Sequence, residues 1–290
     1  MNSFVLRPCA KINLGLEVLQ KRPDGFHDIR SIFIGIDLHD IMEVTAAAVL
    51  DVDCIPPVTD LPTDNLVSRA CRLYAETFPN ENRAAKITVH KRIPTGGGLG
   101  GGSSDAAAAL VAMAMVNGHS LNDSLLRRLQ PLTLQLGSDV PFFLHPRVAL
   151  VEGRGERITP LPFTFPWIIL LVCPGLHINT AHAYSTLGIA GGKPGSNLVD
   201  KLRNAIDIQE IKQDDFTNDF ERSVFLQHPV LADIKRTLID NHAIYASMSG
   251  SGSTMFGLYT SVENATMAQS AFTSMDTYIC HPVQAPFLRP

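Results

Sequence analysis

The feature that most constrains this 290-residue chain is a glycine-rich segment, the glycine loop (residues 94–102), that leads into a run of helix formers. Six of the seven residues from 96 to 102 are glycine, and Ser-Ser-Asp-Ala-Ala-Ala-Ala-Leu follows. Glycine tolerates positive φ and lets a ligand approach backbone N–H groups. We expect Ser103 or Ser104 to cap the helix and Asp105 to lie in its first turn. A glycine turn before a helix N-terminus favours an anion, most often phosphate.

Two well-known phosphate loops fit this segment poorly. A G-x-G-x-x-G pattern occurs at Gly96, Gly98 and Gly101, after a strand predicted at 87–93. A dinucleotide fold then requires a buried strand ending in an acid about 20 residues later, whereas residues 121–136 have a helical pattern. A Walker A loop is excluded because no lysine follows the glycines. A mobile linker is disfavoured because the segment lies between an amphipathic strand and an alanine-rich helix.

The composition is typical of a globular enzyme large enough for two lobes. Hydrophobic residues make up 45% of the chain and charged residues 18%. The net charge of −4 disfavours nucleic acid or a membrane as a partner, so a local positive group must meet any anionic ligand. The five cysteines lack metal-ligand spacing and are expected to be reduced. The start of the chain is unlike a signal peptide and no apolar run could span a bilayer, so we expect a cytoplasmic protein.

Periodicity predicts strands and helices in an α+β order. Apolar residues alternate over 12–18 and 32–38, as in half-buried strands, and a helix is predicted from Asp64 onward. A hairpin is predicted around residues 153–155. A second glycine-rich turn, the C-terminal turn (residues 247–253), lies between two predicted strands and is expected to support a site. This order predicts an α+β protein with antiparallel strands and helices on one face.

A proline-rich stretch at 160–166 is the best candidate for a domain boundary. It divides the chain into an N-terminal domain, residues 1–159, and a C-terminal domain, residues 160–290. The glycine loop then belongs to the N-terminal domain, and the C-terminal turn to the other.

Three segments, in order, resemble the motifs of the GHMP kinase superfamily. Pro8-Cys-Ala-Lys-Ile-Asn-Leu lies near the start, the segment 94–105 in the middle and the C-terminal turn near the end, so the resemblance covers the full chain. It implies a two-lobed α+β fold with antiparallel and mixed sheets, helices packed on one face and a deep cleft between the lobes. It also implies that ATP binds at the glycine loop.

Further segments resemble one family within it, the 4-diphosphocytidyl-2-C-methyl-D-erythritol kinases. They are Arg22-Pro-Asp-Gly-Phe-His27, Leu136-Gly-Ser-Asp-Val-Pro141 and Asn218-Asp-Phe-Glu221. That family uses ATP and Mg²⁺ to phosphorylate the 2-hydroxyl of a CDP-linked polyol on the methylerythritol phosphate route to isoprenoid precursors. Homoserine or mevalonate kinase activity is the first alternative, although neither is expected to carry the Asp-Gly-aromatic-His segment. A catalytically inactive nucleotide-binding regulator is the second.

The resemblance implies two catalytic side chains and an ATP site. Asp139 is implied as the general base, although by itself it could simply cap a turn. Lys11 is the one charge in an apolar strand opening, where an isolated lysine usually extends its amine to solvent. The resemblance instead implies that Lys11 supports Asp139 and the developing alkoxide. The implied ATP-binding residues are Asn65, Pro94, Gly96, Gly97, Gly98, Leu99, Gly100, Gly101, Gly102, Ser103 and Ser104.

The resemblance also implies how the substrate is held. Cytosine would lie between Phe26 and Tyr184, with His27 at its polar edge, although both rings could be ordinary core residues. Phe26 stands where the family commonly has tyrosine, so the stacking face remains without the hydroxyl. The remaining implied contacts are Asn13, Thr180 and Gly250.

No protein metal site is predicted. Phosphates and water would carry most of the Mg²⁺ coordination, and a contribution from Ser104 or Asp105 is left open. We expect a monomer or weak homodimer.

Overall fold

Three four-stranded sheets form the framework of the computed structural model, which describes residues 3–188 and 192–283. The first sheet has the order β1 (Ser3–Leu6), β4 (Ile41–Ala47), β6 (Ala84–His90), β5 (Asp51–Ile55). The second has β2 (Cys9–Lys21), β3 (His27–His39), β7 (Ala149–Gly153), β8 (Arg157–Pro160). The third has β10 (Tyr245–Met248), β11 (Met255–Tyr259), β9 (Ile168–Cys173), β12 (Asp276–Cys280). All strand pairs are antiparallel except β5 with β6, so the first sheet is mixed.

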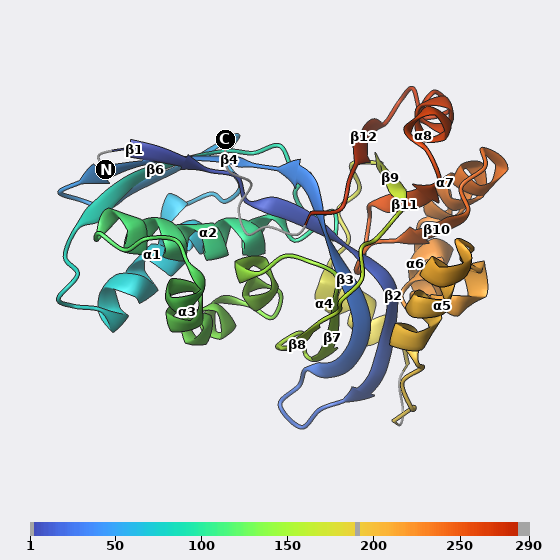
Figure 1. Cartoon of the computed structure of the whole chain (residues 1–290), viewed down its shortest axis with the longest axis horizontal. Coiled ribbons are helices and arrows are strands. Elements are labelled where there is room, and N and C mark those ends of the chain that lie inside the picture. Colours follow the sequence, from blue (N-terminus) through green and yellow to red (C-terminus); the bar gives the residue numbers. More distant parts are fainter. Residues whose placement is uncertain (1–2, 189–191, 284–290) are drawn as a thin grey trace.

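Three helices cover one face of the first sheet (Figure 1). They are α1 (Leu66–Thr77), α2 (Gly101–Val116) and α3 (Asp123–Leu136). Helix α2 is the central one, and its alanines 106–109 are fully buried. The small side chains of α2 let the neighbouring elements pack closely around it. A helix that is buried on all sides in this way is apolar on all sides.

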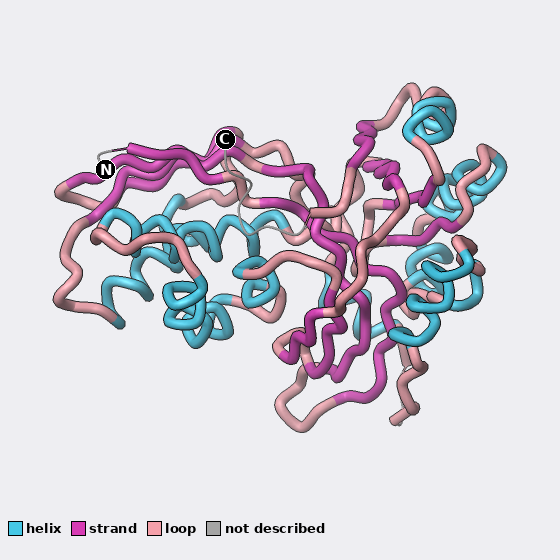
Figure 2. Tube along the Cα trace, viewed as in Figure 1, coloured by secondary structure: helices cyan, strands magenta, loops and turns pink. Residues whose placement is uncertain are grey.

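The third sheet has a packed core on each face. One core joins it to the long strands β2 and β3 and to α5 (Leu198–Ile208), through residues such as Ile12, Ile34 and Ile169. The other packs it against α6 (Glu221–Gln227), α7 (Pro229–Asp240) and α8 (Val262–Gln269). Figure 2 shows β2 and β3 passing between the two halves of the molecule. The remaining short elements are α4 (Thr180–Thr186), η1 (Pro62–Asp64), η2 (Val140–Leu144) and η3 (Gln213–Asp215).

The predicted α+β fold is confirmed, but the start of α2 differs from the prediction. The N-cap is Gly100, with φ of 74°, and the helix begins at Gly101. Ser103 and Ser104 therefore lie inside the helix, and Asp105 lies beyond its first turn. The physical reason is that Gly100 is the last residue of the loop with positive φ, so helical backbone starts directly after it.

Two other boundaries also differ. Strand β6 ends at His90, three residues before the predicted end. Strand β8 spans the predicted domain boundary between residues 159 and 160, so a cut there would divide a strand. The two-domain division itself remains a prediction.

All five cysteines are free and buried, in agreement with the expectation of reduced core residues. Within the described part of the chain, no helix has both the length and the apolarity needed to span a membrane.

The glycine loop makes hydrogen bonds with the C-terminal turn and with Thr254, which follows that turn. The Gly97 carbonyl accepts a hydrogen bond from the Thr254 amide at 3.2 Å, and the Gly98 carbonyl accepts one from the Ser249 hydroxyl at 3.0 Å. Gly98 has φ of +79°, and a Cβ added to it would lie 2.1 Å from the Ser249 carbonyl oxygen. Only glycine fits there, so the close approach of the two turns requires glycine at position 98.

A buried ion cluster attaches the start of α2 to the first sheet. The Lys91 ammonium pairs with Asp40 and, at 2.6 Å, with Asp105. Asp40 also accepts the backbone amides of Arg92 and Ile93. Two carboxylates thus share one ammonium. Burial raises the pKa of Asp105 to about 7, Lys91 opposes the rise and Asp40 adds to it.

Gly98→Ala is expected to destabilise the protein strongly, while Gly102→Ala is not. The first change adds a methyl group against a carbonyl at a positive φ, a combination that costs about 2–5 kcal/mol. A Cβ at Gly102 meets only Leu66 Cδ1, at 3.7 Å, and alanine favours the helix that contains it. Chemical unfolding of both variants measures the difference. Equal stabilities would contradict the close approach of the two turns.

Asp105→Asn is expected to make stability less dependent on pH. The folded-state pKa of Asp105 is raised, so its contribution to stability is complete below its ordinary pKa and is lost as pH rises through about 7. The variant should therefore gain free energy of unfolding relative to wild type between pH 5 and pH 8. Unfolding across that range measures the gain.

Asp40→Asn is the matched control for this cluster. An amide there turns its NH₂ toward the Lys91 ammonium, so this variant should be less stable than wild type throughout. A difference between wild type and Asp105→Asn that stays constant from pH 5 to pH 8 would contradict the assignment.

Candidate active site

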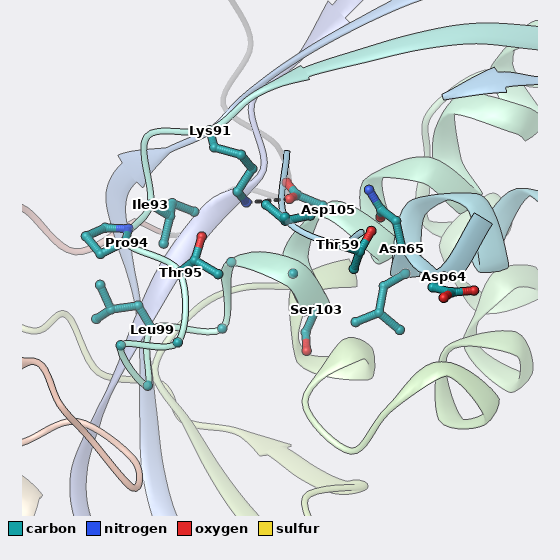
Figure 3. Close-up of a pocket in the computed structure, with 18 residues that line it drawn as sticks. Thr59, Asp64, Asn65, Lys91, Ile93, Pro94, Thr95, Leu99, Ser103 and Asp105 are labelled. Atoms are coloured by element: carbon teal, nitrogen blue, oxygen red, sulfur yellow. Dashed lines mark hydrogen bonds and ion pairs between the residues drawn. The ribbon is translucent and has the colours of Figure 1, made fainter. Parts of the chain in front are cut away.

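Two cavities meet at the glycine loop, and Gly98 and Gly100 line both of them. The first, the loop cavity, measures about 310 Å³ and lies between the glycine loop and residues 58–66 (Figure 3). The second, the cleft cavity, measures about 630 Å³ and is lined by β2, β3, α4 and the C-terminal turn. The glycine loop is therefore a wall that the two cavities share.

Nearly all the predicted ATP-binding residues line the loop cavity. They include all the predicted residues between Pro94 and Ser103, and Asn65 on the opposite wall, and Thr95, which was not predicted, lines the cavity as well. Asn65 also caps α1, where its side-chain oxygen accepts the Val67 amide at 2.7 Å. Ser104 is the exception, because its side chain is fully buried behind the wall. The first amides of α2 have no partner within the helix and can bind an anion.

Two side-chain oxygens near the head of α2 lack a partner among the described residues, and only the Asp105 oxygen belongs to a residue that lines the loop cavity. Ser104 Oγ and Asp105 Oδ1 are buried and have no hydrogen-bond partner in the described structure. Lys91, which lines the same cavity, holds the other Asp105 oxygen, as Figure 3 shows. Within residues 3–188 and 192–283, no three His, Cys, Asp or Glu side chains form a metal-binding group.

Lys11 and Asp139 lie together in the cleft cavity. Lys11 Nζ is 3.6 Å from Asp139 Oδ2, and it donates to Asn13 Oδ1 at 2.6 Å and to the Gly98 carbonyl at 2.9 Å. The lysine is 3% exposed, so it does not extend to solvent. Burial lowers the pKa of Lys11, and the Asp139 carboxylate opposes that shift. The ammonium is therefore fixed beside a carboxylate that lines the cleft cavity.

The local sequence explains how these two groups reach each other. Lys11 lies near the start of β2, and its backbone amide bonds to the Leu99 carbonyl at 2.9 Å, which sets it against the glycine loop. Asp139 lies between Gly137, which ends α3, and the short helix η2. Its side chain is 31% exposed, enough to accept a proton from a ligand in the cavity.

Three ring-bearing residues line the other end of the cleft cavity, in an arrangement unlike the implied one. His27 stacks on Tyr184, with ring centroids 4.7 Å apart and planes at 16°. Phe26 is 49% exposed, and the Arg154 guanidinium lies 4.9 Å from its ring centroid. A base held between Phe26 and Tyr184 therefore requires the His27 ring to move. Burial lowers the pKa of His27, so its neutral ring can donate from one nitrogen and accept at the other.

The other predicted substrate residues also line the cleft cavity. Asn13 is fixed from both sides, by Lys11 and by the Ser31 hydroxyl, which accepts its amide at 3.1 Å. Thr180 Oγ1 lies 2.9 Å from Ser251 Oγ, next to Gly250. The structure thus brings together every predicted catalytic and substrate residue.

Asn218 and Glu221 have a structural role that the sequence did not predict, although both belong to the motif Asn218-Asp-Phe-Glu221. The Asn218 amide donates to the carbonyls of Met248 and Gly250, both at 2.8 Å. Glu221 accepts from the Ser247 hydroxyl and the Met248 amide. These side chains hold the C-terminal turn in position.

Two cations were also missed, Lys91 in the loop cavity and Arg154 in the cleft cavity. The sequence offered one signal for each: Lys91 lies shortly before the glycine loop, and Arg154 lies between two glycines.

Comparison with known proteins identifies the family. Residues 65–147 match the N-terminal domain of GHMP kinases, and residues 198–275 match their C-terminal domain. The 4-diphosphocytidyl-2-C-methyl-D-erythritol kinase of Solibacter usitatus is 44% identical over 88% of this chain and 80% of its own length. The protein of the same name from Chlorobaculum parvum is 35% identical over 95% of this chain and 94% of its own.

Solved structures agree with these matches. The crystal structure of a 4-(cytidine 5′-diphospho)-2C-methyl-D-erythritol kinase has a TM-score of 0.82 and 30% identity, covering 97% of this chain and all of that one. A homoserine kinase from Cytophaga hutchinsonii, with a TM-score of 0.68 at 18% identity over 99% of this chain and 97% of that one, shares the fold. The chain is a small-molecule kinase and belongs to the 4-diphosphocytidyl-2-C-methyl-D-erythritol kinase family of the GHMP kinases.

Proposed function

We propose that this kinase transfers the γ-phosphoryl group of ATP to the 2-hydroxyl of 4-diphosphocytidyl-2-C-methyl-D-erythritol, on the methylerythritol phosphate route to isoprenoid precursors. One observation carries the proposal. A phosphate-binding loop cavity and a cleft cavity with aromatic side chains share Gly98 and Gly100, directly beside Lys11 and Asp139.

In this proposal the triphosphate lies along the glycine loop. The free amides at the head of α2 point their partial positive charge at it, and the glycines allow close approach. Bound Mg²⁺ would neutralise charge on the phosphates. Asp105, which lines the loop cavity and whose Oδ1 has no hydrogen-bond partner in the described structure, is the residue that would hold it or its water ligands.

Asp139 then acts as the general base. It accepts the proton of the substrate hydroxyl while the oxygen attacks the γ-phosphorus, and the bond from that phosphorus to the β–γ bridging oxygen breaks to release ADP. The Lys11 ammonium stabilises the negative charge that develops on that oxygen. Its contacts with Asn13 and Gly98 hold it in place beforehand, so little reorganisation accompanies the reaction.

The ring-bearing residues favour a cytidine substrate over homoserine or mevalonate. Phe26, His27 and Tyr184 offer flat apolar faces and a neutral imidazole, which suit a heterocyclic base. The two smaller substrates have no base to occupy this end of the cavity. The enzyme is proposed to act in the cytoplasm, as a monomer or weak homodimer.

Asp139→Asn should lower kcat by roughly 10²–10⁴-fold, because asparagine keeps the shape of the side chain but cannot accept the proton. ATP affinity and thermal stability should remain close to wild type. Asp233→Asn, which removes an exposed carboxylate on α7 that pairs with Arg236, is the control and should keep its activity.

A coupled ATPase assay with the diphosphocytidyl substrate, homoserine and mevalonate measures this effect. Retention of more than a tenth of wild-type kcat in Asp139→Asn would exclude it as the base. Turnover of homoserine or mevalonate in preference to the cytidine substrate would overturn the proposed function.

Phe26→Ala should raise KM for the diphosphocytidyl substrate about tenfold or more, since stacking a base on a ring is worth roughly 1–3 kcal/mol. Because Phe26 is half exposed, the change leaves the core intact. Phe26→Tyr keeps the ring and is the matched control. KM for ATP should not change in either variant. A higher KM for ATP in Phe26→Ala would place this ring in the other binding site.

A further inference from the structure

We propose that Arg154 is a specificity-determining residue that binds the diphosphate group of the substrate. The inference rests on the proposed function, because it assumes a ligand in which a diphosphate joins cytidine to the reacting polyol. Such a ligand places its negative charge between the ring-bearing end of the cleft cavity and the Lys11–Asp139 pair.

Arg154 lies between those two ends. It belongs to the turn joining β7 to β8, and its guanidinium lies over Phe26, 4.9 Å from the ring centroid. The next residue, Gly155, lies so close to Ser138 that an added Cβ would be 3.1 Å from the Ser138 carbonyl oxygen. Since Asp139 follows Ser138, the turn runs along the cavity wall from the rings to the catalytic carboxylate.

The guanidinium of Arg154 is available for a ligand. Over residues 3–188 and 192–283 it has no hydrogen bond or ion pair. It contacts the Phe26 ring, and the Asp24 carboxylate is close enough to interact with its charge. Nearby Asp24 pairs with Arg22 at 3.1 Å. The backbone is fixed in contrast, because the Arg154 amide donates to Glu156 Oε2 at 2.7 Å.

The other cations of the cleft cavity suit this role less well. Lys11 is buried and already bound to Asn13, Gly98 and Asp139. Lys21 lies opposite His27 in the register of β2 and β3. It therefore lies at the ring-bearing end of the cleft cavity, away from the Lys11–Asp139 pair. A guanidinium also binds two phosphate oxygens at once through its planar fork, which an ammonium cannot do.

Binding of cytidine and of CDP tests the inference directly, because the two differ only in the diphosphate. Both are titrated by calorimetry into protein whose loop cavity is saturated with a non-hydrolysable ATP analogue. Arg154→Met should weaken CDP about tenfold to a hundredfold and leave cytidine unchanged, as expected for the loss of hydrogen bonds to a charged group. In turnover assays, KM for the diphosphocytidyl substrate should rise while kcat changes little. Arg154→Lys should fall between Arg154→Met and wild type.

Two variants control for charge and for ring contact. Lys21→Met removes a positive charge from the same cavity, and its effect on CDP should be much smaller. Arg203→Met removes a guanidinium that lies outside the cavity, 5.7 Å from the Phe163 ring centroid. It should leave the affinities for cytidine and for CDP unchanged.

Three results would overturn the inference: equal weakening of cytidine and CDP in Arg154→Met, equal effects of Lys21→Met and Arg154→Met on CDP, or no effect on CDP. A wild-type protein that binds CDP through Arg154 yet does not phosphorylate the diphosphocytidyl substrate would instead overturn the proposed function and support this inference.

Discussion

The buried ammonium of Lys11 is the interaction on which the site depends. Removing an amine from water is costly unless its donors are satisfied, and here Asn13, the Gly98 carbonyl and Asp139 satisfy them. These partners come from three separate parts of the chain: β2, the glycine loop and the turn before η2. The need to solvate one charge therefore fixes Asp139, the glycine loop and β2 relative to each other.

A second constraint is steric, and glycine meets it. Gly98 lies against the Ser249 carbonyl, and a Cβ at Gly100 would lie 2.6 Å from the Phe143 ring. The loop therefore packs tightly against protein on one side while it opens to a ligand on the other. Asn218 and Glu221 hold the C-terminal turn in position for this packing, which gives their shared motif a structural purpose.

Much of this arrangement could be predicted from local sequence. Alternation identified β2 and β3, and the glycine loop before an alanine-rich helix predicts an anion site, which stays a prediction. The helix start could not be placed, because a positive φ at Gly100 depends on how the loop packs rather than on its composition. The stacking of His27 on Tyr184 could not be predicted either, because those residues come from β3 and α4 and meet only through the tertiary fold. Ser104 looked like a loop-cavity residue but is turned inward by its position in the helix.

The distribution of charge explains how an acidic protein can bind two anionic ligands. The net charge is −4, so no long-range field favours them, and attraction must come from individual cations within the cavities. Lys91 is already bound by two carboxylates, and Lys11 is bound by one. In the loop cavity the glycine amides must therefore supply most of the attraction, which needs no charged side chain. In the cleft cavity Arg154, whose guanidinium has no ion pair within residues 3–188 and 192–283, is the group that we propose compensates a diphosphate.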